Sequence, residues 1–184
     1  MRVISGLRKG HRINSPKGMD TRPTEDKVKE SLFNILGHVH EDSLVLDLFA
    51  GSGSIGIEFL SRGAKECYFV DLSSQSISVI NDNLLHTKLI QLSTVIKSDA
   101  IKAIKHLHNK RLKFDYIYLD PPFRHKDLLY NVLSTLNEYP ILCDEALLII
   151  EHESDLALED SGFSFNKIDE RRYGSKTITF FRQD

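Results

Sequence analysis

The chain has 184 residues, of which 41% are hydrophobic and 27% are charged, a balance typical of one compact globular domain with a small extension. The longest uninterrupted apolar run, Ala146 to Ile150, is too short to cross a membrane, and the basic start lacks the apolar stretch of a secretory signal. We therefore expect a cytoplasmic protein with no membrane partner, whose two lone cysteines, Cys67 and Cys143, are buried and reduced.

The net charge of −2 conceals an asymmetry between the start of the chain and the remainder. Residues 1–30 contain eight Lys or Arg and four Asp or Glu, a net charge of +4, whereas residues 31–184 contain 16 and 22, a net charge of −6. A basic segment on an acidic body is typical of contact with nucleic-acid phosphate, although the charge alone fits a solvated terminus equally well. The expected nucleic-acid-binding residues are Arg2, Arg8, Lys9, Arg12 and Arg22.

The chain is predicted to begin with a basic arm, residues 1–23, followed by a main domain, residues 24–184, because Ser, Pro and Gly punctuate the boundary. Within the arm, Arg2–Ser5 and His11–Asn14 are short strand candidates on either side of a glycine-containing turn, which predicts a β-hairpin. Thr24 is the expected N-cap of the helix that follows.

From residue 44 onward, strand patterns alternate with helical patterns. Repeated strand–helix units predict an α/β fold with a doubly wound, mostly parallel sheet, and the last two strands form an antiparallel pair at one edge. Ligands of such sheets bind at the carboxyl ends of the strands. The seven expected strands are 44–49, 67–71, 94–97, 114–120, 146–151, 163–170 and 175–181, and the helices between them are 54–62, 73–86, 100–109 and 126–137.

The first of these strands runs into a Gly-x-Gly-x-x-Gly turn, Gly51 to Gly56, that opens a helix. The glycines permit a tight turn and a close approach of the backbone to a ligand. Asp71 ends the next strand, 20 residues after Gly51, where a carboxylate can accept hydrogen bonds from two ribose hydroxyls. Two cofactors fit this pattern, NAD and S-adenosylmethionine.

Two further acids favour S-adenosylmethionine. Asp47 precedes the glycine-rich turn, where a carboxylate suits a cationic, amino-acid-bearing ligand better than a dinucleotide. Asp99 closes the third strand, so that its side chain can accept the adenine amino group while the Ala100 amide meets a ring nitrogen. The N-cap of the following helix is an equally good role for Asp99, and the two roles are compatible.

The strand 114–120 ends in Asp120-Pro121-Pro122-Phe123, an unusual combination of a carboxylate, two prolines and an aromatic ring. Proline restricts both its own φ and the residue before it, so Asp120 and Pro121 are held extended. The Asp120 carboxylate and the Pro121 carbonyl can accept the two N–H groups of an exocyclic amine and stabilise the charge that develops on it during methyl transfer. Phe123 offers a face on which a flipped base can stack.

These motifs resemble those of class I methyltransferases, which have a Rossmann-like fold. The segment from Asp47 to Gly53 resembles their first motif, and Asp120 to Phe123 resembles their (Asn/Asp)-Pro-Pro-(Tyr/Phe) amino-methylation motif. Other stretches are similar to the RsmD-type family in particular, and together they span almost the whole chain. These stretches are Met1 to Gly6, Thr21 to Thr24, Val28 to Asn34, Leu60 to Ala64 and Arg172 to Gly174.

The resemblance implies methylation of guanine N2 in 16S ribosomal RNA of partly assembled small subunits, by a protein we expect to be a monomer. Phe123 stands where tyrosine is commoner and Asp71 where glutamate is commoner, and neither change removes the implied chemistry. Arg22 is equally compatible with RNA contact, a structural role or the cofactor cleft. The implied cofactor-binding residues are Asp47, Phe49, Ala50, Gly51, Ser52, Gly53, Asp71, Leu72, Asp99 and Ala100, and the implied catalytic residues are Asp120, Pro121, Pro122 and Phe123.

Several other functions remain open on the sequence. Adenine-N6 or cytosine-N4 methylation of DNA and methylation of protein glutamine use a similar catalytic tetrapeptide. An NAD-dependent dehydrogenase fits the glycine-rich turn but leaves Asp120 to Phe123 unexplained, and a non-catalytic RNA-binding module explains only the arm. No metal site is expected, because the His38/His40 and His106/His108 pairs are accompanied by no acid or cysteine cluster.

Overall fold

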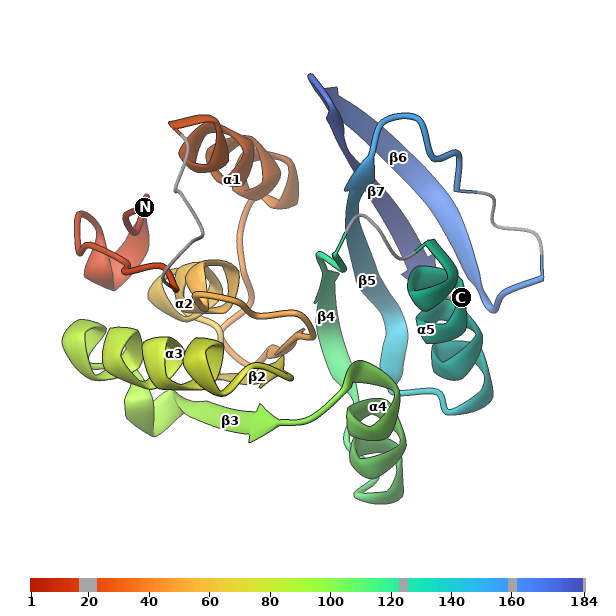
Figure 1. Cartoon of the computed structure of the whole chain (residues 1–184), viewed down its shortest axis with the longest axis horizontal. Coiled ribbons are helices and arrows are strands. Elements are labelled where there is room, and N and C mark those ends of the chain that lie inside the picture. The colour runs from red at the N-terminus through yellow and green to blue at the C-terminus, as the bar shows by residue number, and fades with distance from the viewer. Residues whose placement is uncertain (17–22, 123–125, 159–161, 184) are drawn as a thin grey trace.

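The computed structural model describes residues 1–16, 23–122, 126–158 and 162–183 (Figure 1). Within these ranges the chain alternates strands and helices around one central sheet. The strands are β1 (Leu44–Asp47), β2 (Glu66–Asp71), β3 (Ser93–Lys97), β4 (Phe114–Leu119), β5 (Leu142–Glu153), β6 (Phe165–Tyr173) and β7 (Lys176–Gln183). The helices are α1 (Pro23–Leu36), α2 (Ser54–Ser61), α3 (Ser74–Thr87), α4 (Ala100–Asn109) and α5 (Lys126–Glu138), with 3-10 turns η1 (Gly6–Arg8) and η2 (Ile90–Leu92).

The seven strands of the described chain form one mixed sheet in the order β3-β2-β1-β4-β5-β7-β6. The first five strands are parallel to one another, and β7 pairs antiparallel with both β5 and β6. The strand order reverses between β1 and β4, and this is the switch point at which open α/β sheets bind their ligands. The structure thus confirms the predicted doubly wound sheet with an antiparallel C-terminal edge.

Two apolar clusters cover the two faces of the sheet. Helices α1, α2 and α3 pack on one face and α4 and α5 on the other, as Figure 1 also shows. The alternation of side chains along β4 separates the two clusters, because Tyr116 and Tyr118 face the first and Ile117 and Leu119 the second. Residues at the ends of the central strands are therefore held between two packed layers.

The N-terminal segment, residues 1–16, differs from the predicted hairpin. It contains a single antiparallel bridge between Arg2 and Arg12 and the turn η1, in place of two paired strands. Backbone hydrogen bonds still join the two halves, from the Val3 N–H to the His11 carbonyl at 2.9 Å and from the Ile13 N–H to the Met1 carbonyl at 3.0 Å, but the pairing does not extend further because the next donors bind a side chain of α2. The N–H groups of Ile4 and Ser5 donate to the carboxylate of Glu58 at 2.8 and 3.0 Å.

Several element boundaries also differ from the expectation; β1 ends at Asp47 instead of 49, and β6 spans Phe165–Tyr173 instead of 163–170. Helix α1 begins at Pro23, one residue before the predicted cap Thr24, and proline is favoured at a first helical position because that N–H needs no intrahelical partner. Strand β5 spans Leu142–Glu153, longer than the expected 146–151, because Leu142 already pairs with Phe114 ahead of a bulge and the last residues of β5 continue to pair with β7 beyond the end of β4.

Candidate functional site

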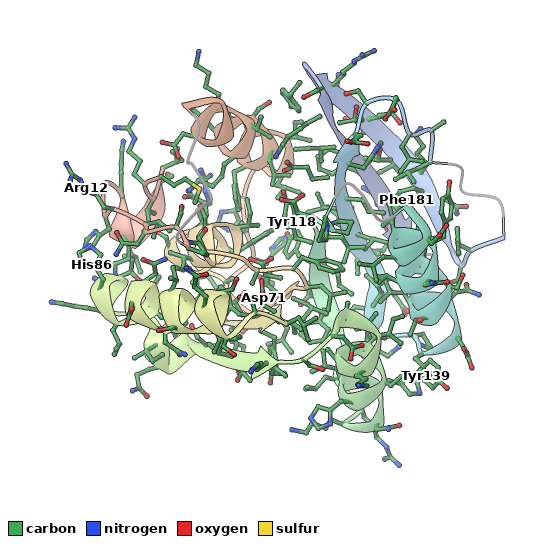
Figure 2. The ribbon with its side chains drawn as sticks, in the orientation of Figure 1. Arg12, Asp71, His86, Tyr118, Tyr139 and Phe181 are labelled. Atoms are coloured by element: carbon green, nitrogen blue, oxygen red, sulfur yellow. The ribbon has the colours of Figure 1, made fainter. Side chains whose placement is uncertain are left out.

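Four of the sequence-predicted acids lie at one edge of the sheet, the carboxyl ends of the parallel strands. Asp47 is the last residue of β1 and Asp71 the last of β2, while Asp99 follows β3 and Asp120 follows β4. Figure 2 places Asp71 and Tyr118, a residue of β4, near the centre of the molecule. The fold therefore brings the predicted cofactor loop and the predicted reaction loop to the switch point between β1 and β4.

Backbone hydrogen bonds fix the glycine-rich loop between two neighbouring strands. The Leu48 N–H donates to the Tyr118 carbonyl at 3.0 Å, and the Ala50 N–H donates to the Val70 carbonyl at 2.9 Å. Gly53, with φ of +77°, is the N-cap of α2, a conformation that side-chain-bearing residues rarely adopt. The loop thus connects the end of β1 to the N-terminus of α2.

Gly56, the third glycine of the motif, allows α2 to pack closely on β2. A Cβ atom at this position would lie 2.3 Å from the ring of Phe69 and 2.7 Å from the sulfur of Cys67. Both of those side chains are fully buried, so neither can move aside without cost. The close approach also allows the Gly56 N–H to reach the Asp47 carboxylate at 3.1 Å.

Asp47 is a carboxyl group with only 2% of its surface exposed. Burial raises its pKa from 3.8 to about 7, and the charge of Asp71 adds to this, whereas the hydrogen bond from Gly56 opposes it. A carboxylate in this setting gains most from a cationic partner. The chemistry of the site therefore suits a ligand that carries positive charge.

Asp71 accepts a backbone hydrogen bond at each of its carboxylate oxygens, and one of the two donors belongs to the glycine-rich loop. Oδ2 accepts the Gly51 N–H at 2.8 Å and Oδ1 accepts the Ser73 N–H at 2.8 Å. Each oxygen keeps a further lone pair, so the group can still accept ligand hydroxyls. The next residue, Leu72, is 67% exposed, and its apolar side chain offers a surface for a flat ring beside these oxygens.

Asp99 is the N-cap of α4, where its side chain accepts the Lys102 N–H at 2.9 Å and forms an ion pair with the Lys102 ammonium at 3.3 Å. Slight burial raises the pKa of Asp99, but these contacts with Lys102 outweigh it and lower the pKa below 3.8. The capping role left open by the sequence is thus confirmed. Ala100, the first residue of α4, is buried next to it.

The predicted reaction loop begins where β4 ends. Asp120 is partly exposed, Pro121 is buried and Pro122 is exposed. Phe123 lies outside the described residues, as does Arg22 in the N-terminal part of the chain. The described part of the loop therefore places a carboxylate at the switch point, followed by a buried proline, on the strand next to the one that leads into the glycine-rich loop.

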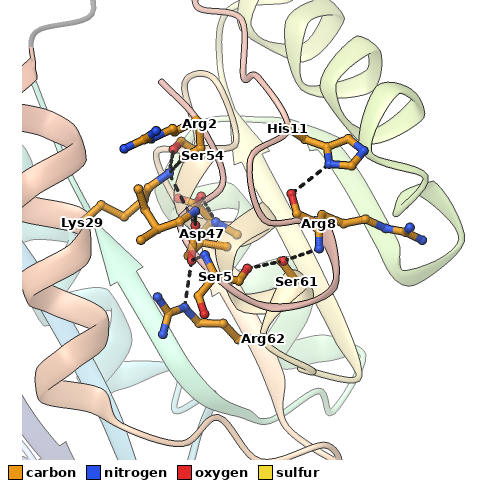
Figure 3. Close-up of polar contacts among 12 residues, drawn as sticks. Arg2, Ser5, Arg8, His11, Lys29, Asp47, Ser54, Ser61 and Arg62 are labelled. Carbon is orange, nitrogen blue, oxygen red and sulfur yellow. Dashed lines mark hydrogen bonds and ion pairs between the residues drawn. The ribbon is translucent and has the colours of Figure 1, made fainter.

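The N-terminal segment is attached to α2 by a buried polar network, shown in Figure 3. Glu58, which is fully buried, binds the backbone of Ile4 and Ser5 and pairs with Arg62 at 2.8 Å. The Lys29 ammonium, 3% exposed, donates to the Arg2 carbonyl at 2.7 Å and to the Ser54 hydroxyl at 2.8 Å. These contacts join the start of the chain to the first turn of α2.

Asn83 of α3 makes a second connection between the N-terminal segment and the glycine-rich loop. Its amide accepts the Asn14 N–H at 2.9 Å and donates to the Asn14 carbonyl at 2.9 Å. The same amide nitrogen donates to the Ser52 carbonyl at 2.8 Å. A single buried side chain therefore spans the two segments. Arg12 and His86 lie at this end of the molecule, on the left of Figure 2.

Comparison with known proteins identifies the family. A family model described as "Conserved hypothetical protein 95" matches residues 1–182. The chain belongs to this family. It is 36% identical over 183 residues to the "Putative rRNA methyltransferase YlbH" of Bacillus subtilis, covering 100% of this chain and 99% of that one. It is 38% identical over 160 residues to "Ribosomal RNA small subunit methyltransferase D" of Haemophilus influenzae, covering 86% and 81% of the two chains.

A solved structure agrees with this assignment to the Conserved hypothetical protein 95 family. The "Putative methyltransferase yhhF" of Escherichia coli superposes with a TM-score of 0.83 at 28% identity, covering 100% of this chain and 98% of that one. The Escherichia coli "Ribosomal RNA small subunit methyltransferase D" is 34% identical over 158 residues and is covered over 77% of its length. These relatives confirm the resemblance to the RsmD-type family that the sequence motifs indicate.

Sequence reasoning missed the polar residues that hold this family member's site together, notably Lys29, Glu58 and Asn83. Glu58 had a signal, because it interrupts the apolar run of α2 from Ile55 to Leu60. Asn83 had no such signal, because an asparagine within a helix is normally expected to face solvent. Its three hydrogen bonds depend on segments 31 and 69 residues away.

The structure also shows the surroundings of the two cysteines, for which no functional role is expected. Cys67 is fully buried, as expected, whereas Cys143 is partly exposed. Over the described ranges, no three His, Cys, Asp or Glu side chains are grouped to hold a metal ion. Nor is any of the helices in those ranges long and apolar enough to cross a bilayer.

Proposed function

We propose that this protein transfers a methyl group from S-adenosylmethionine to the exocyclic N2 amine of a guanine in small-subunit (16S) ribosomal RNA. The observation that carries the proposal is the position of Asp120-Pro121-Pro122. It follows β4 at the switch point, beside the loop that Asp71 and the backbone of Val70 hold in place. An amine acceptor and a cofactor cradle on adjacent central strands suit a direct transfer between two bound ligands.

The residues present fit S-adenosylmethionine. The free lone pairs of Asp71 suit ribose hydroxyls, exposed Leu72 suits the adenine ring, and buried Asp47 suits the ammonium of the amino-acid end. Asp99, already a helix cap, retains lone pairs for the adenine amino group. The backbone around the loop completes the set through Phe49, Ala50, Gly51, Ser52, Gly53 and Ala100. The bound cofactor supplies an electrophilic sulfonium methyl group.

The base amine is activated by this chain's own acceptors. The lone pair of an exocyclic amine is delocalised into the ring, so the amine is a poor nucleophile. Hydrogen bonds from its two N–H groups to the Asp120 carboxylate and the Pro121 carbonyl favour a pyramidal nitrogen and stabilise the positive charge that develops on it. Pro121 is buried and its ring restricts φ, which limits the orientations available to the loop at this point.

The substrate class rests on the relatives and on the charge of the N-terminal segment. The relatives carry the names of ribosomal RNA methyltransferases. Arg2, Lys9 and Arg12 are exposed on a segment whose backbone is fixed to the body of the protein. Arg8, which is also expected to contact phosphate, lies on the same segment and is partly exposed.

The test uses small ribosomal subunits from cells that lack the gene. These particles are incubated with the protein and methyl-labelled S-adenosylmethionine, and the labelled nucleoside is identified after digestion of the RNA. Label in N2-methylguanosine is expected. Label in another methylated base would contradict the guanine-N2 assignment, and label only in added DNA or protein would contradict an RNA substrate altogether.

A further inference from the structure

A buried polar network that the proposed reaction does not use lies at the ends of the central strands. Tyr118 of β4 donates its hydroxyl to Glu151 Oε2 of β5 at 2.6 Å, and the other oxygen, Oε1, pairs with the Lys176 ammonium of β7. Tyr118 is 3% exposed and Glu151 is 5% exposed. Three adjacent strands are thus joined by side chains as well as by their backbones.

Strand register places this network next to both predicted reaction partners. Tyr118 is paired with Asp47 of β1 in the β1–β4 ladder, so the two side chains are neighbours on one face of the sheet. Leu119 is paired with Ile150, so that Asp120 and Glu151, the next residues of the two chains, lie side by side. Tyr118 therefore lies between the buried cofactor-side carboxyl group and the start of the reaction loop.

The surroundings of the network do not require polar groups. Its neighbours on this face of the sheet include the buried apolar side chains Ile149, Ile178 and Phe180. A buried ion pair and hydroxyl contribute little net stability over well-packed apolar residues of similar size. Their place at the carboxyl ends of β4 and β5, where an α/β sheet binds its ligands, gives them a different use.

We propose that Tyr118 and Glu151 are positioning residues for the methyl transfer, which fix the end of β4 so that Asp120 and the Pro121 carbonyl keep the geometry that holds the amine. This inference rests on the proposed function. The hydrogen bond from Tyr118 to Glu151 ties β4 to β5 two residues before Asp120. Lys176 balances the charge of Glu151, so that Asp120 has no uncompensated carboxylate beside it.

The ionisation of Tyr118 is consistent with a fixed donor. Burial and the nearby carboxylates of Glu151, Asp120 and Asp47 raise the pKa of its phenol well above 10. The hydroxyl hydrogen is therefore retained throughout the working pH range. Because Glu151 accepts that hydrogen, the oxygen of Tyr118 is oriented and the end of β4 cannot rotate about this contact without breaking it.

The experiment compares Tyr118→Phe with Tyr116→Phe. Tyr116 is the matched control, since it lies on the same face of the same strand two residues earlier, is also buried, and takes no part in the network. We expect Tyr118→Phe to lower kcat for methyl transfer to small-subunit particles by roughly tenfold or more, because small displacements of reacting groups cost that much. The KM for S-adenosylmethionine and the affinity for S-adenosylhomocysteine should stay within about twofold.

A second pair of variants separates positioning from stability. Glu151→Gln keeps an acceptor for Tyr118 and should retain more kcat than Glu151→Ala, while thermal unfolding of each variant records any loss of stability. Equal kcat in Tyr118→Phe and Tyr116→Phe would overturn the inference and leave the proposed function standing. An equal loss of S-adenosylhomocysteine binding and of kcat in Tyr118→Phe would also overturn it. Wild-type protein without activity on any RNA would overturn the proposed function itself.

Discussion

Asp47 and Asp71 end neighbouring strands yet occupy contrasting environments. Asp47 is enclosed and accepts one backbone hydrogen bond, whereas Asp71 is partly exposed and accepts two. Desolvation consequently governs the first carboxyl group, and the second acts mainly as a clamp on the loop. The difference suits an ammonium group at one site and hydroxyl groups at the other.

The buried carboxyl group of Asp47 should make stability depend on pH. Its pKa in the folded protein is about 7, above the ordinary value of 3.8, so the folded state binds this proton more tightly than the unfolded chain. The resulting stabilisation is fully present below an ordinary Asp pKa and is lost as pH rises through about 7. Asp47→Asn, which has no such proton, should gain stability relative to wild type as pH rises from about 4 to about 7, and the difference should be constant above that range.

Urea unfolding of wild type and Asp47→Asn across this pH range measures the difference directly. Other titrating groups affect both proteins alike, so only the difference in unfolding free energy reports on Asp47. A difference that stays constant with pH would mean that Asp47 is not protonated in the folded state near neutral pH.

Asp120 is expected to act on the amine and not on the cofactor. Asp120→Ala should reduce methyl transfer by at least about a hundredfold, because the substitution removes an acceptor aimed at developing charge. Calorimetric titration with S-adenosylhomocysteine should give nearly the wild-type affinity, since the residues proposed to bind the cofactor lie on β1, β2 and α4 and in the loops that follow β1, β2 and β3. Parallel loss of turnover and affinity would show that the two roles are not divided in this way.

Among the elements, α3 has the least obvious role. It packs beside α2 against β2 and β3 and carries Asn83, whose amide joins the N-terminal segment to the glycine-rich loop. The loop is therefore supported from three directions, by β2 and β4 through the backbone and by α3 through this side chain. Support of this kind keeps a ligand-binding loop in position before the ligand arrives.

Asn83→Ala should lower the unfolding free energy by about 2–3 kcal/mol, because three hydrogen bonds are lost and buried backbone groups of Asn14 and Ser52 are left unpaired. S-adenosylhomocysteine should bind more weakly as the loop loses its support. Asn81→Ala is the control, because Asn81 lies on the same helix and bonds only within it. Its cost should be within about 0.5 kcal/mol. Similar losses in both variants would argue against the bridge.

At the scale of the whole molecule, positive charge is concentrated at the N-terminal end. The division into an arm at residues 1–23 and a domain at 24–184 stays a prediction. The described part of that arm is closely packed on the body, since Val3 and Ile13 are buried in the core cluster of α1, α2 and α3. Deletion of the first 20 residues, the experiment that the sequence suggests, would therefore also remove core side chains and the partners of Glu58.

Point substitutions at exposed basic residues test RNA contact without that loss. The double variant Lys9→Gln with Arg12→Gln should weaken binding to small-subunit RNA and reduce the dependence of log affinity on log salt concentration by roughly one to two. The affinity for S-adenosylhomocysteine should not change. Lys105→Gln with Lys110→Gln, on and after α4 on the opposite side of the sheet, is the charge-matched control. Equal effects of both pairs would indicate only non-specific attraction.

The sequence by itself determined the order of strands and helices and the two loops of the site. Alternating apolar patterns, the glycine-rich turn after β1 and the acid followed by two prolines after β4 are local signals, and their carboxyl-end positions follow from the parallel connectivity. The cap role of Asp99 is equally local, because its partner is three residues away.

Only the tertiary structure decided which polar side chains are buried and what they bind. Glu58 and Ile4 are 54 residues apart, Asn83 and Asn14 are 69 apart, and Tyr118 and Glu151 are 33 apart. Such pairs leave no periodic signal, because each partner alone resembles a surface residue or a strand donor. These contacts form when the chain packs into its folded structure, because a buried donor or acceptor that has lost water is stable only with a hydrogen-bond partner.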